Sequence, residues 1–169
     1  MIDFNIDVLP LRNKLYRLAL NITQDVQTAK DVVQETMIKV WEKREKIQDN
    51  EAIEDYCLTT CRNYALDVIK NKNNQNIRLE DDAFRIADTR SQNPLQQTDL
   101  QHKINLIKKL YDALPEKQRS IIHLREIEGK SYKEISVILG ISEEQTKVTL
   151  FRARQAIKQQ FEKLDHYGL

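Results

Sequence analysis

The chain has 169 residues, 40% of them hydrophobic, and it contains only three glycines and three prolines. This length suits one ordinary domain or two small ones, and so few turn-forming residues argue against an all-β protein, so we expect an all-α fold. The formal net charge of +1 argues against a protein that holds DNA unaided, because neutralising phosphates requires a strong excess of cations.

Little in the sequence points to a membrane-spanning or secretory segment, or to redox chemistry at the cysteines. No apolar run is long enough to span a membrane, and the first residues, MIDFNIDVLPLRNK, carry acids where a secretory signal has cations. We therefore expect a cytoplasmic protein. Cys57 and Cys61 lie one helical turn apart and are expected to be small buried side chains in a reducing compartment. A metal site is the alternative, but no histidine has ligand spacing with them, so we expect no metal and no cofactor.

Three amphipathic helices are predicted in the first part of the chain, over residues 7–21, 25–46 and 53–70. In each segment apolar residues recur at intervals of three and four, which indicates one buried face. The polar face of the second helix, taken alone, is interpreted as solvated surface. It includes Asp31, Gln34 and Glu35.

The helical periodicity ends near Asn71 and returns only after residue 101. The stretch between is rich in Asn, Gln and Asp, and a segment of this length without a pattern is unusual inside a compact domain. We therefore expect two small helical domains, 1–72 and 102–169, joined by a flexible linker over 73–101. In the second domain, Gly129 is predicted to close a helix.

A helix-turn-helix is predicted within residues 131–158. Gly140 stands where a helix needs a left-handed closing residue, between two S-x-x-E/Q capping boxes. The capping boxes are Ser131 with Glu134 and Ser142 with Gln145. The second helix carries several cations, which favours a helix that lies in a DNA major groove. The alternative is a plain packing pair of helices with a solvated basic face.

Charge is divided unevenly along the chain. Residues 60–79 and 142–158 carry more cations than acids, whereas residues 80–101 carry more acids than cations. Two modestly basic segments suggest a protein that touches DNA twice and weakly. Such a protein needs a larger partner that carries most of the DNA affinity.

The order of these motifs resembles the extracytoplasmic-function (ECF) branch of the sigma-70 family of transcription initiation factors. The motifs are DVVQETMIKVWEKREK, CRNYALDVIKNK, ALPEKQRSIIHLREIEGKSYKEISVILGIS and VTLFRARQAI, and the resemblance covers about residues 11–161. It implies a sigma factor that directs core RNA polymerase to specific promoters and assists opening of the −10 element. It also implies an anti-sigma factor as a partner. Neither the resemblance nor any catalytic motif points to an enzyme.

The resemblance also implies roles for particular residues. The polar face of the second helix would dock on the clamp helices of the largest polymerase subunit, through Asp31, Gln34 and Glu35. The third helix and the loop before it would bind the −10 strand, through Tyr56, Arg62, Asn63 and Lys70. Tyr56 and Tyr64 could stack on bases, but tyrosine at such positions also packs in cores, and we leave both possibilities open.

The helix-turn-helix would read the −35 element as duplex DNA. Base edges would face Lys147, Val148 and Phe151, and phosphates would face Ser142, Arg152 and Arg154. The acidic linker would thread polymerase channels, or it is a plain tether. The chain departs from the family pattern at 144–146 and Thr149, and again at 59–61, which leaves the preferred −35 and −10 sequences undetermined.

Two other classes of protein remain as alternatives. A stand-alone helix-turn-helix regulator would bind a palindromic site as a dimer, whereas a sigma factor contacts two unlike elements as a monomer. A scaffold that binds only protein would not depend on Arg152 and Arg154 for any DNA interaction.

Overall fold

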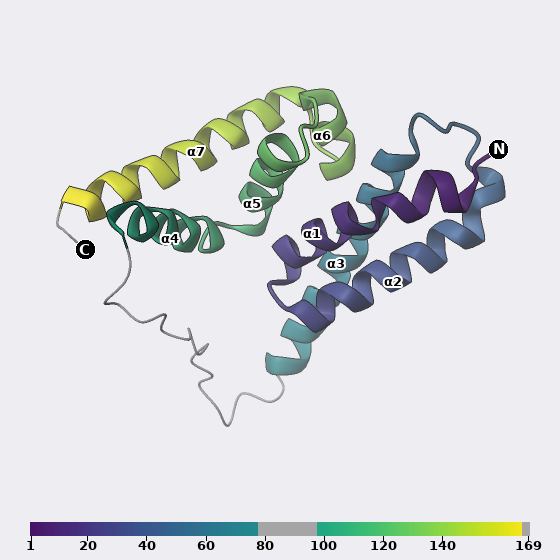
Figure 1. Cartoon of the computed structure of the whole chain (residues 1–169), viewed down its shortest axis with the longest axis horizontal. Coiled ribbons are helices and arrows are strands. Elements are labelled where there is room, and N and C mark those ends of the chain that lie inside the picture. The colour runs from purple at the N-terminus through teal and green to yellow at the C-terminus, as the bar shows by residue number, and fades with distance from the viewer. Residues whose placement is uncertain (78–97, 167–169) are drawn as a thin grey trace.

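The structure is a computed structural model that describes residues 1–77 and 98–166, and these residues form helices and connecting turns without a β-strand. The all-α prediction is confirmed. Figure 1 shows two helical bodies that lie against each other. We call them the N-terminal body, which contains α1 to α3, and the C-terminal body, which contains α4 to α7.

The N-terminal body is a bundle of three long helices. A turn of π-helix (η1, Phe4–Val8) and a short 3-10 turn (η2, Leu9–Leu11) lead into α1, Arg12–Thr23. The other helices are α2, Val26–Lys43, and α3, Ile53–Ile77, with a short 3-10 turn (η3, Arg44–Lys46) after α2. We predicted that the first helix begins at residue 7. It begins later, because Pro10 lacks an amide hydrogen and lies in the 3-10 turn before α1.

The ends of α1 and α2 are set by local hydrogen bonds. Gln24 closes α1 in the left-handed conformation, with φ of 54°, and its amide donates to the Leu20 carbonyl. Asp25 then caps α2, because its carboxylate accepts from the Thr28 amide at 2.8 Å. The Thr28 hydroxyl also donates to Asp25, which helps to lower the pKa of this carboxyl below its ordinary value. The two helices can therefore turn sharply and pack side by side.

The core between α1, α2 and α3 consists of the apolar residues that the periodicity indicated. Its fully buried members include Leu15, Leu18, Ile22, Val32, Val40 and Leu58. Cys57 and Cys61 lie in the same core as free thiols, so the prediction of buried cysteines is confirmed. Burial raises the pKa of each thiol to about 12, so both stay protonated and unreactive near neutral pH.

Helix α3 is longer than predicted. We expected it to end near Lys70, but it continues to Ile77 through a polar sequence without glycine or proline. The Lys72 ammonium donates to the Thr28 hydroxyl, which ties this extension to α2. A tertiary contact therefore supports a helical turn that the apolar periodicity does not indicate.

The C-terminal body contains α4, Asp99–Asp112, α5, Glu116–Ile122, α6, Tyr132–Leu139, and α7, Glu143–His166. A turn of π-helix (η5, His123–Ile127) extends α5. Figure 1 shows α4 running alongside the C-terminal part of α7, with α5 and α6 toward the N-terminal body. Gly129 has a φ of 68°, as expected for a residue that closes a helix.

Helices α6 and α7 form the predicted helix-turn-helix. The Ser131 hydroxyl accepts from the Glu134 amide at 3.1 Å, while the Glu134 carboxylate accepts from the Ser131 amide at 2.7 Å. The same reciprocal pair joins Ser142 and Gln145, both at 3.1 Å. Both capping boxes are thus confirmed. The two helices are held together by apolar residues that are largely or fully buried, namely Ile135, Ile138, Leu139, Leu150 and Ala153.

The turn between α6 and α7 depends on Gly140, whose φ is 66°. No atom would crowd an added Cβ, so a substitution there costs only backbone strain. We expect Gly140→Ala to lower the free energy of unfolding by about 1 kcal/mol, measured by urea denaturation. Gly140→Asn should lose less, because asparagine tolerates the left-handed region. Equal losses for the two variants would contradict this explanation.

Candidate polymerase and nucleic-acid interfaces

The predicted polymerase-binding residues lie together on α2. Asp31 and Gln34 are exposed and Glu35 is half-buried, and Gln27 donates to the Asp31 carboxylate at 3.1 Å. Gln34 also lines an open groove of about 700 Å³ between α1 and α2. The apolar part of the groove is formed by Leu9, Tyr16, Val33 and Met37. Arg12 and Lys30 also line the groove, so the carboxylates of this face lie outside the groove lining.

The residues predicted to contact the −10 strand do not all share one surface. Tyr56, Asn63 and Lys70 are spaced seven apart, so they follow one stripe of α3. Asn63 and Lys70 are exposed, whereas Tyr56 is half-buried and packs against the core. Arg62 points to the C-terminal body: it is only 7% exposed, and its Nη2 lies 3.3 Å from Glu116 Oε2 of α5.

Tyr64 is also half-buried against the core. The Lys39 ammonium lies 4.2 Å from the centroid of the Tyr64 ring, a cation–π contact between α2 and α3. In this structure both tyrosines pack within the N-terminal body.

Helix α7 presents the predicted −35 residues on its exposed side. Lys147, Val148, Phe151, Arg152 and Arg154 are exposed, and the opposite side buries Thr146, Leu150 and Ala153. Val148 and Phe151 are 47% and 63% exposed, which is high for apolar side chains of a helix in a folded body. Such side chains can contact the methyl groups of thymine in a major groove.

Two of the predicted phosphate contacts have partners within the chain. The Ser142 hydroxyl accepts from the Gln145 amide in the capping box, and Arg154 pairs with Glu126 of η5. Both side chains of the Arg154 pair are about half exposed, so this pair is weak and can exchange for a phosphate. The Lys147 ammonium lies 5.5 Å from the Tyr132 ring centroid and remains exposed.

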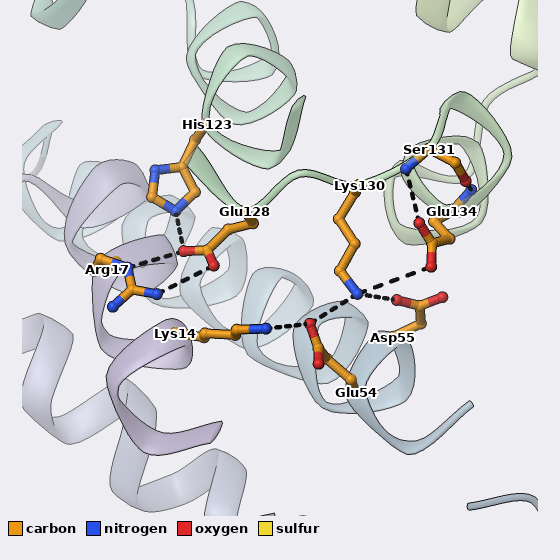
Figure 2. A network of polar contacts seen from close by, with 9 residues as sticks. All are labelled: Lys14, Arg17, Glu54, Asp55, His123, Glu128, Lys130, Ser131 and Glu134. Carbon is orange, nitrogen blue, oxygen red and sulfur yellow. Dashed lines mark hydrogen bonds and ion pairs between the residues drawn. The ribbon is translucent and has the colours of Figure 1, made fainter. Parts of the chain in front are cut away.

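A polar network that no sequence pattern indicates joins the two bodies (Figure 2). Its first part centres on Glu128, whose side chain is only 1% exposed. Arg17 of α1 donates to both Glu128 oxygens, at 2.9 and 3.1 Å, and His123 Nε2 lies 3.2 Å from Glu128 Oε1. Burial disfavours the imidazolium more than Glu128 favours it, so the pKa of His123 is lowered below its ordinary value.

The second part of the network centres on Lys130, which is 8% exposed. Its ammonium lies 2.8 Å from Glu54 Oε1 and 2.9 Å from Asp55 Oδ1, and both carboxylates stand in the first turn of α3 (Figure 2). Lys14 of α1 also pairs with Glu54, at 2.9 Å. Burial alone would raise the pKa of Glu54, but the hydrogen bonds from Lys130 and Lys14 hold that pKa below its ordinary value.

A third set of contacts surrounds Arg119 of α5, which is 8% exposed. Its Nε donates to the Asn21 carbonyl at 3.2 Å, and its Nη1 donates to the Leu114 carbonyl at 2.5 Å. Nη2 lies 3.5 Å from the Ile22 carbonyl. These α1 carbonyls stand in the last turn of the helix, where carbonyl groups lack partners within the helix. The Tyr111 hydroxyl donates to the Asn21 side-chain oxygen at 2.6 Å.

Within residues 1–77 and 98–166, no group of His, Cys, Asp and Glu side chains is arranged to hold a metal ion. No helix in this part of the chain is both long and apolar enough to cross a membrane. The acidic stretch 80–101, expected to thread polymerase channels, lies almost wholly outside the residues that the structure describes.

Comparison with known proteins agrees with the fold. The Sigma-70 region 2 family model matches residues 8–75, and the Sigma-70 region 4 family model matches residues 104–157. The ECF RNA polymerase sigma factor SigM of Bacillus subtilis is 28% identical over 147 residues, which is 86% of this chain and 87% of that protein. The RNA polymerase sigma-H factor of Pseudomonas aeruginosa is 26% identical over 91% of this chain and 83% of that protein.

Among solved structures, the sigma factor RpoE of Bartonella quintana, in complex with the anti-sigma factor NepR, matches with a TM-score of 0.74. The match has 25% sequence identity and covers 96% of this chain and 98% of that chain. CnrH, solved with the cytosolic domain of CnrY, shares the fold with a TM-score of 0.66 at 19% identity.

The chain has a region 2 bundle followed by a region 4 helix-turn-helix. It therefore belongs to the sigma-70 family of transcription initiation factors. Within that family it is a member of the ECF branch, as the resemblance of its motifs implied. Members of this family are sigma factors, not enzymes. The family membership does not favour the stand-alone regulator.

Proposed function

We propose that this chain binds core RNA polymerase through α2, contacts the −10 element with α3 and the −35 element with α7, and so selects promoters. The observation that carries the proposal is the coexistence of two unlike surfaces in one chain: the face of α2 that carries Asp31 and Glu35, and the cationic helix α7. The matches to region 2 at 8–75 and region 4 at 104–157 support this division of labour. The domain boundaries predicted at residues 72 and 102 each fall inside a helix, because α3 continues to Ile77 and α4 begins at Asp99.

We assign roles to those predicted residues whose side chains are accessible on α2, α3 and α7. Asp31, Gln34 and Glu35 would form the polymerase contact, and Asn63 and Lys70 would lie along the −10 strand. On α7, base edges would face Lys147, Val148 and Phe151, with Arg152 and Arg154 on phosphates. The polymerase performs the chemistry, so the chain itself has no catalytic role, and it acts in the cytoplasm with the polymerase and the DNA. An anti-sigma factor, the partner of the Bartonella quintana relative, would be a further partner.

Because the net charge is only +1, the isolated chain should bind promoter duplex weakly. We expect run-off transcripts from a promoter library only when the chain and core polymerase are combined, and we expect sequence-specific promoter binding to appear with the polymerase. Core polymerase without the chain is the control. Tight, sequence-specific binding by the chain alone at physiological salt would instead support a stand-alone regulator.

A further inference from the structure

We infer that Tyr132, the first residue of α6, is a positioning residue that holds Lys147 of α7 in place for reading the −35 element. The role in promoter reading rests on the proposed function, because it assumes that Lys147 faces a base edge. The contact itself is a feature of the fold. The Lys147 ammonium lies 5.5 Å from the centroid of the Tyr132 ring, within reach of a cation–π interaction.

The choice of this partner is informative because carboxylates stand close by on the same helix. Glu143 and Glu144 precede Lys147 by four and three residues, the spacings at which an acidic side chain ordinarily pairs with a lysine. Neither carboxylate pairs with Lys147 in the described part of the chain, and the ammonium contacts the Tyr132 ring instead. The preferred neighbour of Lys147 is therefore aromatic and uncharged.

An aromatic ring orients a cation without cancelling its charge. If Lys147 were paired with a carboxylate, that pair would have to break before the ammonium met an acceptor on a base. The ring attracts the ammonium through its quadrupole and leaves the full positive charge in place. Arg154 shows the other arrangement, because its guanidinium pairs with Glu126. Lys147 is thus oriented while it stays charged and exposed.

Tyr132 can orient Lys147 because its own ring is fixed on several sides. The ring is half-buried against the core, and Tyr132 directly follows Ser131, whose capping box sets the start of α6. The Arg125 guanidinium carbon lies 4.4 Å from the ring centroid, and Arg125 Nη1 donates to the Lys130 carbonyl at 2.9 Å. A lysine held against a fixed ring has already lost part of its rotamer freedom, so less entropy is lost when it binds DNA.

The first test measures promoter choice by the full chain with core polymerase, using run-off transcription from a library randomised in the −35 element. Lys147→Ala identifies the base position that Lys147 reads, because the preference there should relax. We expect Tyr132→Leu to relax the preference at the same position about two- to fivefold, and at no other position. Tyr132→Phe keeps the ring and should keep the wild-type preference. Adding Tyr132→Leu to Lys147→Ala should cause no further loss, because Tyr132 acts through Lys147.

The second test measures the contact in the free chain by nuclear magnetic resonance. Protons near the face of an aromatic ring are shifted upfield, so the ε-methylene protons of Lys147 should resonate upfield of those of Lys133, which is exposed on α6. Tyr132→Leu should remove this shift, and Tyr132→Phe should retain it.

Three results would overturn the inference: no upfield shift in the wild type, additive effects of Tyr132→Leu and Lys147→Ala, or a loss spread evenly over all −35 positions. The last result would mean that Tyr132 only supports the fold of the helix-turn-helix. A wild-type chain that shows the upfield shift but gives no promoter-dependent transcripts with core polymerase would instead count against the proposed function itself.

Discussion

Replacing Asp31 and Glu35 together with lysine is expected to weaken association with core polymerase by about 10- to 100-fold, or about 1.4 to 2.8 kcal/mol. Both carboxylates lie on the accessible face of α2, beside the groove that Gln34 lines, and neither takes part in the core. Reversing them replaces attraction by repulsion toward the cationic partner surface that a carboxylate pair favours. The measurement is fluorescence anisotropy of labelled chain titrated with core polymerase.

The control for this experiment is a second double reversal, Glu162→Lys with Asp165→Lys, near the end of α7. Both side chains are exposed, and the contact between Asp165 and Lys103 is long, at 3.9 Å, so little stability should be lost. This control changes the net charge equally and should bind polymerase like the wild type. Equal weakening in both double variants would mean that total charge, and not the α2 face, determines the association.

Leu15→Ala is expected to lower the free energy of unfolding by about 2 to 5 kcal/mol. Leu15 is fully buried in α1, and its backbone carbonyl lies 3.5 Å from the Cys61 sulfur of α3, so the site is enclosed by the packed bundle. Removing its isobutyl group leaves a cavity that the long helices around it cannot easily collapse. Urea denaturation followed by circular dichroism measures the loss.

Leu9→Ala is the matched change at the surface. Leu9 is 45% exposed, so its loss should cost less than about 1 kcal/mol. If Leu15→Ala also cost under 1 kcal/mol, the three helices of the N-terminal body could not be packed as tightly as described.

Helix positions were predictable wherever the signal was local. The capping boxes of Ser131 and Ser142 act within four residues, and the left-handed Gly140 needs only its own backbone, so the helix-turn-helix was predicted correctly. The end of α3 was predicted too early, because the turn after Lys70 carries no apolar pattern and is supported by the contact of Lys72 with α2.

The exposed side of each candidate site was also predictable from the sequence, except at Arg62. The exposed side of α7 follows from its apolar spacing, and so does the polar face of α2. Arg62 is the exception, because a cation on an amphipathic helix is ordinarily solvated, and only the neighbouring body shows that it is covered.

The sequence by itself determined the helices, the helix-turn-helix and the division into two bodies, because helical periodicity and capping arise from residues three or four positions apart. Only the tertiary structure decided that the two bodies dock. Arg17 and Glu128 are 111 positions apart, and Lys130 and Asp55 are 75 apart. No local sequence pattern predicts such pairs, because each charged side chain taken alone resembles ordinary solvated surface. Whether it is buried depends on where the second body docks.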